Sequence, residues 1–207
     1  MAFDFKKEFK EFYLPATKPA IVEMPVMNYL AVRGKGNPNA EGGEYKQALE
    51  QLYGIAYTLK MSYQSDYRIE GFFEYVVPPL EGLWWAENGE IDYTNKDDFC
   101  FISMIRLPNF ITEKDVQWAI REATRKKKMD FSQVGFFPYD EGLCVQCMHI
   151  GSYEDEPATI KAMVEYAQSQ GYQIAIDNVR RHHEIYLSDP RKTSAEKLKT
   201  VIRYPIK

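Results

Sequence analysis

Apolar and polar residues alternate along the chain in patterns that predict strands and helices in a regular order. In the first half, an apolar run predicts a strand at Met27–Gly34, and the Gly- and Asn-rich stretch 35–43 predicts a loop. Apolar residues spaced three and four apart from Tyr45 to Leu59 predict a long helix. Further strands are predicted at Gly71–Val77, Leu83–Ala86 and Phe99–Leu107.

The second half shows the same order of elements after a linking helix. Thr112 is the predicted N-cap of that helix, whose first turn carries Glu113 and Asp115. A second helix is predicted to begin at Pro157 and to end at Gly171. Thr193 and Glu196 form a predicted capping box for a short helical turn. Strands are predicted at Gly142–Gly151, His182–Leu187 and Thr200–Pro205.

Short sequence matches indicate that the two halves are repeats of one unit. MIRLP at 104–108 resembles VIRYP at 201–205, and each is preceded by a glutamate in a strand-like segment, Glu74 and Glu184. Glu74 precedes Arg106 by 32 residues and Glu184 precedes Arg203 by 19, so the first unit carries 13 extra residues, expected around the two adjacent tryptophans at 84–85.

This repeat predicts an α+β fold made of two pseudo-symmetric strand–helix–strand–strand modules. Their antiparallel sheets would enclose a ligand cleft between them. We expect a single domain over 1–207, with a lead-in at 1–20, a first module at about 21–110, a linking helix at 111–135 and a second module at about 136–207.

Composition narrows the class of protein. The 207 residues include 26 Lys and Arg against 30 Asp and Glu, and this net charge of −4 argues against a dedicated nucleic-acid binder. Aromatic residues make up 14% of the chain, which is more natural on a wall that faces a flat ligand than in a core alone. The absence of an apolar signal segment or membrane span, together with three cysteines, indicates a reducing cytoplasm.

Glu184 is the strongest candidate for chemistry. Strand alternation places it on one face with His182 and Tyr186, where a partly desolvated carboxylate could hold a cation or act as a general base toward water. The alternative is a solvated edge-strand glutamate paired with Arg180 or Arg181.

Other aromatic residues are candidates for a ligand-binding wall. Tyr53 and Tyr57 lie four apart, so they share one side of the first helix, either in the core or toward a ligand. Trp84 and Trp85 point to opposite faces of a strand, so one can be buried while the other lines a pocket. Two residues of the following strand, Phe101 and Met104, complete the predicted binding set.

Metal, redox and nucleotide chemistry find little support in the sequence. Cys144 and Cys147 form a CxxC, but they fall in a strand-like run that points them to opposite faces, which favours buried small hydrophobes. The basic run Arg125–Lys128 fits the end of a helix better than a nucleic-acid patch. No second close ligand pair accompanies the CxxC, and the adjacent His182 and His183 diverge on a strand, so no metal is expected. No phosphate-binding glycine motif occurs, so no nucleotide cofactor is expected.

Several longer segments resemble the stand-alone GyrI-like small-molecule-binding proteins. These are FDFKKEFKEFYLP, MNYLAVRGKGNPN, LYGIAYTLK, PPLEGLWW and HHEIYLSDPRK, which together span most of the chain. The resemblance implies two fused strand–helix–strand–strand modules, in agreement with the repeat.

The resemblance also implies a function. Related stand-alone proteins hydrolyse cyclopropanoid DNA-alkylating natural products; other relatives are drug-sensing domains or gyrase inhibitors. It implies Glu184 as the catalytic base, and we expect Tyr57 or Tyr186 to donate a hydrogen bond to the developing phenolate oxygen. Planar aromatic or cationic small molecules are the expected partners, without nucleic acid or membrane, and a gyrase partner stays open. A non-catalytic drug-binding or sensor role is the alternative.

Overall fold

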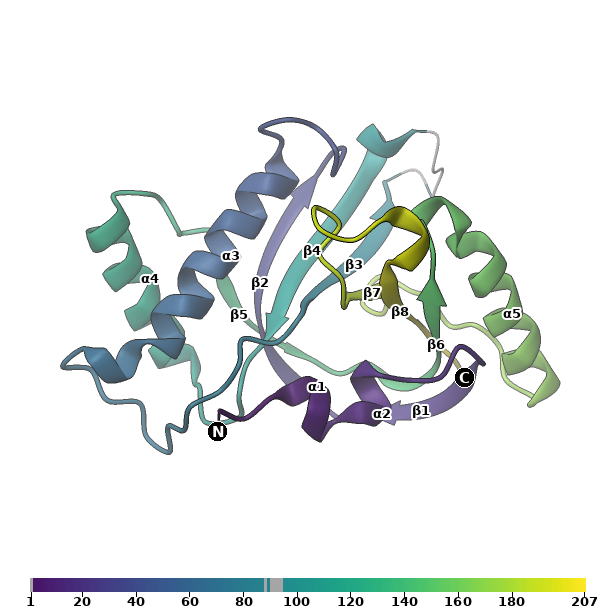
Figure 1. Cartoon of the computed structure of the whole chain (residues 1–207), viewed down its shortest axis with the longest axis horizontal. Helices are drawn as coiled ribbons and strands as arrows, with labels where there is room; N and C mark the ends of the chain where they lie inside the picture. Colours follow the sequence, from purple (N-terminus) through teal and green to yellow (C-terminus); the bar gives the residue numbers. More distant parts are fainter. Residues whose placement is uncertain (1, 88, 90–94) are drawn as a thin grey trace.

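The computed structural model describes residues 2–87, 89 and 95–207. Its strands form one curled antiparallel sheet in the order β1-β6-β8-β7-β3-β4-β2-β5 (Figure 1). The helices are α1 (Phe5–Glu8), α2 (Lys10–Tyr13), α3 (Glu44–Lys60), α4 (Glu113–Lys127) and α5 (Glu156–Ser169). The strands are β1 (Ala20–Met24), β2 (Met27–Lys35), β3 (Leu80–Ala86), β4 (Phe99–Arg106), β5 (Gly135–Tyr139), β6 (Gly142–Ile150), β7 (His182–Tyr186) and β8 (Lys199–Pro205).

Two strand–helix–strand–strand modules make up the body of the sheet, as the repeat predicts. The first consists of β2, α3, β3 and β4, and the second of β6, α5, β7 and β8. In each module the last strand pairs with both of the others. The modules meet at the centre, where β3 and β7 pair antiparallel, so the predicted α+β fold is confirmed with one continuous sheet in place of two.

Two strands that the sequence patterns did not predict extend the sheet at its edges. β1 precedes the first module but pairs with β6 of the second, while β5 precedes the second module but pairs with β2 of the first. Each of these strands is joined to the next by two residues, 25–26 and 140–141. The repeating unit therefore has a leading strand, and the two halves exchange these strands.

The structure corrects the pairing of Glu74 with Glu184, on which the count of extra residues in the first unit rests. Residues 71–77 form no strand of the sheet, and their only described ladder contact is an isolated bridge from Tyr75 to Phe3. Glu74 therefore lies outside the sheet and is not the counterpart of Glu184, which lies in β7.

Register identifies the true counterpart of Glu184. Ile105 in the first module corresponds to Ile202 in the second; Leu80 pairs with Ile105, and Glu184 pairs with Ile202. Leu80 thus occupies the position that Glu184 occupies in the second half. Leu80 precedes Arg106 by 26 residues and Glu184 precedes Arg203 by 19, so the first module has seven extra residues, not 13, in the β3–β4 segment that carries the two tryptophans. The two modules share a backbone plan, but only one of them places a carboxylate at this position.

The helix caps and the N-terminal segment 1–20 can also be compared with their predictions. Thr112 precedes α4, and its hydroxyl donates to the Asp115 carboxylate at 2.6 Å. The short turn near residue 195 begins after Ser194, whose hydroxyl bonds Glu196, so the predicted Thr193 cap is wrong. The lead-in contains two short helices, and Tyr13 at the end of α2 is buried.

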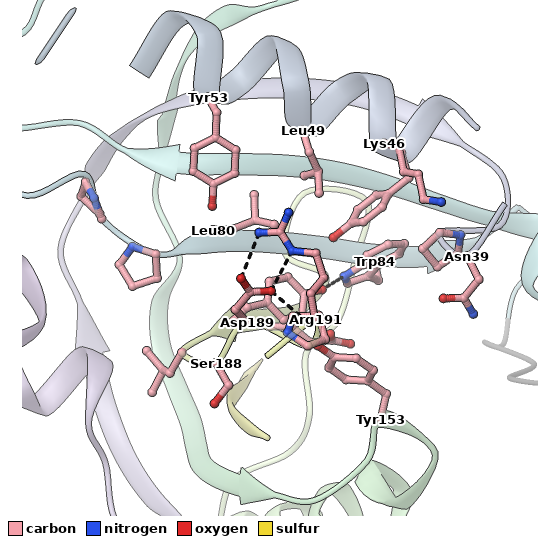
Figure 2. Close-up of a pocket in the computed structure, with 18 of the residues that line it drawn as sticks. Asn39, Lys46, Leu49, Tyr53, Leu80, Trp84, Tyr153, Ser188, Asp189 and Arg191 are labelled. Atoms are coloured by element: carbon pink, nitrogen blue, oxygen red, sulfur yellow. Dashed lines mark hydrogen bonds and ion pairs between the residues drawn. The ribbon is translucent and has the colours of Figure 1, made fainter. Parts of the chain in front are cut away.

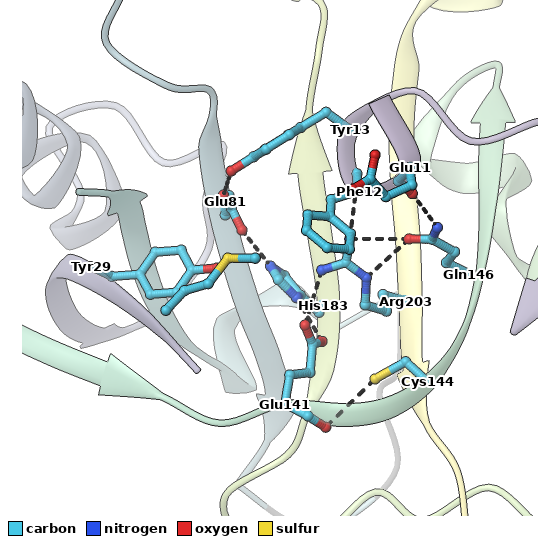
Figure 3. Close-up of polar contacts among 11 residues, drawn as sticks. Glu11, Phe12, Tyr13, Tyr29, Glu81, Glu141, Cys144, Gln146, His183 and Arg203 are labelled. Atoms are coloured by element: carbon cyan, nitrogen blue, oxygen red, sulfur yellow. Dashed lines mark hydrogen bonds and ion pairs between the residues drawn. The ribbon is translucent and has the colours of Figure 1, made fainter. Parts of the chain in front are cut away.

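Alternation along the central strands separates two faces of the sheet. Glu184 of β7 and its partner Gly82 of β3 lie on the face toward α5, whereas their neighbours His183 and Glu81 point to the other face. That second face holds a buried polar cluster that includes Arg203 (Figure 3). Among the described residues, no helix is long and apolar enough to cross a membrane.

Candidate functional site

A cavity of about 870 Å³ lies over the junction of the two modules (Figure 2). This volume falls within the range of about 300–1,000 Å³ that is typical of small-molecule sites. α3 and the segment before β3 form one side of it, and β7, the loop after β7 and the start of α5 form the other. The cavity therefore needs both modules.

Tyrosines from one face of α3 form an aromatic wall. Tyr45, Tyr53 and Tyr57 follow one another at intervals of four or eight residues and all line the cavity. The rings of Tyr53 and Tyr57 lie 6.3 Å apart at 29°, and Tyr57 is half exposed at the mouth. Tyr53 points from α3 into the cavity, and Tyr153 faces it from the opposite side (Figure 2). The sequence analysis predicted Tyr53 and Tyr57 as members of this wall, and Tyr45 is a third.

Trp84 forms the floor beside this wall. Its ring centroid lies 5.3 Å from that of Tyr45, and its indole Nε1–H donates to the Tyr186 hydroxyl at 2.7 Å. Gly82 makes this contact possible, because a Cβ there would lie 2.6 Å from the indole nitrogen. The ring is thus fixed in place at the bottom of the cavity.

Glu184 projects into the cavity from the central strand β7. The His182 imidazole bonds its Oε1 at 2.7 Å through Nε2, and the Tyr204 hydroxyl bonds the other ring nitrogen at 2.9 Å. Its side chain is 12% exposed, so the carboxylate is desolvated but reaches the cavity. The alternative of a solvated edge glutamate does not describe this residue, because β7 is a central strand.

Glu156 is a site residue that the sequence analysis did not single out. It is the first residue of α5, is fully buried, and lines the same cavity. Within the described part of the chain, its carboxyl oxygens have no hydrogen-bond partner other than the neighbouring Glu184 carboxyl. Burial and the negative charge of nearby Glu184 raise its pKa to about 10. Glu156 is therefore protonated at neutral pH.

The nearby tyrosines also keep their protons. Burial, with the charge of Glu184 second, raises the pKa of Tyr186 well above its ordinary value and that of Tyr153 to about 12. Burial likewise raises the pKa of Tyr45. These hydroxyls can donate hydrogen bonds to a ligand or to Glu184 at any physiological pH.

The same region could in principle hold a metal ion. One donor atom from each of Glu156, His182 and Glu184 lies within 4.8 Å of the others. Both ring nitrogens of His182 are already engaged in hydrogen bonds. A metal would have to displace the bond to Glu184, so the arrangement suits a shared proton better than an ion.

A second depression of about 490 Å³ lies on the other side of Trp84 and His182. Trp85 lines it, with the Arg181 guanidinium 4.8 Å from its ring centroid, and so does Tyr204. Of the predicted site residues, Trp85 and His182 therefore border this second depression rather than the aromatic cavity, while Trp84 borders both.

The remaining predicted binding residues lie away from both hollows. Phe101 is fully buried between α3 and the sheet, with its ring 5.2 Å from Tyr45. Met104 is buried on the opposite face of β4, packed with Leu83 and Ile102. Neither lines either hollow. Tyr53, Tyr57, Trp84, Glu184 and Tyr186 are the predicted residues that the fold brings together around the aromatic cavity.

A buried ionic cluster supports the site from the other face of the sheet. His183 bonds Glu141 at 2.8 Å and Glu81 at 3.0 Å, and Arg203 bonds Glu141 at 3.0 Å (Figure 3). Burial alone would lower the pKa of His183, but the two carboxylates outweigh it and raise that pKa to about 9. Burial would raise the pKa of Glu141, yet His183 and Arg203 lower it to about 2.

An α+β sheet with an aromatic-walled cavity between two pseudo-symmetric modules defines the protein as a small-molecule-binding protein. The chain belongs to the GyrI-like family: the model of the GyrI-like small molecule binding domain matches residues 17–207. No curated protein sequence matches it.

Solved structures from Listeria innocua resemble the whole chain. One, an uncharacterized conserved protein, is 44% identical, with a TM-score of 0.93 over 99% of this chain and 100% of that one. Another, described as a hydrolase, is 42% identical, with a TM-score of 0.91 over the same shares. The C-terminal domain of EcmrR is 12% identical over 92% of this chain and 97% of its own, with a TM-score of 0.55, and shares the fold alone.

Proposed function

We propose that the protein is a hydrolase that binds planar aromatic small molecules and opens a strained ring in them with water. The substrates would be cyclopropanoid DNA-alkylating natural products, and the outcome would be detoxification. The observation that carries the proposal is the Glu184 carboxyl beside the fully buried carboxyl of Glu156, beneath an aromatic-walled cavity. The relatives described as hydrolases, which cover the full chain, support it.

The aromatic wall would bind the flat part of the substrate. Tyr45, Tyr53 and Trp84 offer ring faces, and a planar ligand held against them would bring its reactive carbon toward Glu184. At the rim of the cavity, Arg191 forms a bidentate salt bridge with Asp189 at 2.9 Å, so these two charges neutralise each other. Ring contact, rather than net charge, would therefore dominate binding.

Glu184 would act as the general base. A water bonded to its carboxylate attacks the cyclopropane methylene carbon, and the proton of that water passes to Glu184. The C–C bond breaks, and its electron pair moves through the conjugated system onto the carbonyl oxygen, which becomes a phenolate. Tyr57 at the mouth donates a hydrogen bond to that oxygen, which then takes a proton from solvent.

Glu156 would set the charge of the pair. Two adjacent carboxylates cannot both ionise easily, and the one without donors holds the proton. Glu184, which receives the His182 bond, is left as the base. The division of roles follows from the hydrogen-bond environment of each carboxyl.

The test is turnover of a cyclopropanoid compound, followed by mass spectrometry for the addition of one water. We expect Glu184→Gln to lower kcat by about 10²- to 10⁴-fold, the usual worth of general-base help, while binding persists. Glu165→Gln, an exposed glutamate on α5, is the matched control. Recovery of intact compound after long incubation with the wild-type protein would instead indicate binding without chemistry.

A further inference from the structure

His182 and Tyr204 connect the two hollows along the face of the sheet that carries Glu184. His182 is 2% exposed, so its ring is almost closed to water although it borders the second depression. Its Nε2 contacts Glu184 at the aromatic cavity, and its Nδ1 contacts Tyr204, which lines the second depression. The three side chains form an unbroken hydrogen-bonded line from the proposed base to a separate surface.

We propose that Glu184, His182 and Tyr204 form a proton relay that connects the base to solvent in the second depression. The relay rests on the proposed role of Glu184 as base. A planar ligand in the aromatic cavity would cover Glu184, so its proton would need another path. The second depression, which lies beyond Trp84 and His182, provides that path.

The two hydrogen bonds carry a proton outward when the imidazole holds its own proton on Nδ1. Glu184, protonated by the attacking water, then donates to Nε2, and Nδ1–H donates to the Tyr204 oxygen. A shift outward moves the Glu184 proton to Nε2, the Nδ1 proton to Tyr204 and the Tyr204 proton to water, which leaves Glu184 ionised. After the product leaves, an inward shift with a proton from water returns the ring proton to Nδ1, and Glu184 releases its proton to water in the open cavity.

Neighbouring groups favour these roles. Titratable side chains face the imidazole from three elements: Glu184 on β7, Tyr204 on β8 and Glu156 on α5. From β3, the register partner of His182 is Trp84, which does not titrate. Glu156 is fully buried and, among the described residues, has no hydrogen-bond partner beyond Glu184, so the path outward from Glu184 leads through His182.

The first experiment needs no turnover. The exchange of the His182 ring proton with solvent is measured by NMR in the full chain saturated with ethidium as a planar cationic probe. We expect Tyr204→Phe to slow this exchange by about tenfold or more. Tyr172→Phe is the matched control, because Tyr172 packs against the same hydrophobic cluster as Tyr204. Equal exchange rates in wild type and Tyr204→Phe would overturn the relay.

The second experiment uses turnover of the cyclopropanoid compound. Tyr204→Phe and His182→Gln should each lower kcat by about 10- to 100-fold, the range seen when a partner that orients a functional group is removed, with KM unchanged. The solvent deuterium isotope effect on kcat should rise, because proton return becomes slow; a merely structural role would not raise it. Unchanged kcat and isotope effect in both variants would refute the relay.

The two experiments separate the relay from the proposed function. If wild-type protein turns over no cyclopropanoid compound, the proposed function fails, and the NMR exchange rates still decide whether the relay exists. If turnover occurs but Tyr204→Phe matches the wild type in both experiments, the relay fails while the hydrolase proposal stands.

Discussion

Gly82 shows how one small residue shapes the cavity. It pairs with Glu184 across the central strands, and the space that a side chain would fill is taken by the Trp84 indole and the Tyr186 hydroxyl. A Cβ at this position would lie 2.6 Å from Nε1 of the indole and 3.1 Å from the hydroxyl oxygen. The residue opposite the candidate base therefore has to be glycine for the floor of the cavity to form.

Gly82→Ala should displace the Trp84 ring and break its bond to Tyr186. A hydrogen bond contributes about 1 kcal/mol, so we expect ethidium to bind about fivefold more weakly. Fluorescence titration of the dye measures the change. Gly135→Ala on β5, where a Cβ would meet nothing within 4 Å, should bind as the wild type does. Equal affinity of both variants would show that the ring is not held in this way.

Residue patterns predicted part of the site and missed the rest for a physical reason. Strand alternation put His182, Glu184 and Tyr186 on one face, and the structure agrees. Glu156 carries no such signal, because a glutamate in the first turn of a helix is ordinarily a solvated partner of the helix dipole. Only the packing of α5 against the sheet, which is a tertiary contact, buries it beside Glu184.

At the scale of elements, the stability of α4 depends on the hydrogen bonds of its first turn. The Asp115 carboxylate accepts from the Thr112 backbone N–H at 2.8 Å and from its hydroxyl at 2.6 Å. The Tyr67 hydroxyl bonds the same carboxylate at 2.8 Å, and its ring stacks on Trp118 at 4.3 Å. These bonds attach the long segment after α3 to the helix that supports α3 from outside.

Thr112→Ala should lower the free energy of unfolding by about 1 kcal/mol, the usual cost of losing such a cap. Thr112→Ser keeps the hydroxyl and should retain most of the free energy of unfolding that Thr112→Ala loses. Urea denaturation followed by circular dichroism measures both. A threonine-to-alanine variant as stable as the wild type would indicate that Asp115 and Tyr67 hold the turn without the hydroxyl.

Helices and strands could be predicted from the sequence wherever apolar residues recur at a regular spacing. The apolar series of α3 and the strands β2, β4, β6, β7 and β8 were predicted close to their observed bounds. β1 and β5 were not, because each is a short edge strand whose partner lies in the other half of the chain. The false strand at 71–77 arose from aromatic residues that pack against the lead-in, as Phe73 does on Phe3 at 5.3 Å.

For the whole molecule, three buried groups should set how stability varies with pH. His183 has its pKa raised from 6.5 to about 9, so its contribution is complete below pH 6.5 and is lost as pH rises through 9. Glu141 has its pKa lowered from 4.5 to about 2, so its contribution is complete above pH 4.5 and is lost as pH falls through 2. Urea midpoints measured from pH 3 to 10 should peak between these limits, at about pH 4.5–6.5.

Glu156 moves the stability maximum toward pH 4.5 and steepens the alkaline decline. Its pKa is raised from 4.5 to about 10, so the folded protein prefers the protonated form and loses stability as pH rises between those values. Glu156→Gln should therefore be more stable than the wild type at pH 8 while its turnover falls. Glu165→Gln should match the wild type in both respects. A variant at Glu156 that is less stable at pH 8 would contradict the assigned protonation.

The exchanged leading strands have a consequence for ancestry. A single half of this chain could complete the same sheet only by pairing with a second copy, each lending its first strand to the other, as β1 and β5 do here. The present chain thus has the form of a two-fold dimer fused into one polypeptide. Fusion frees the two copies to differ, and the contrast between Leu80 and Glu184 is the kind of asymmetry that an identical pair could not possess.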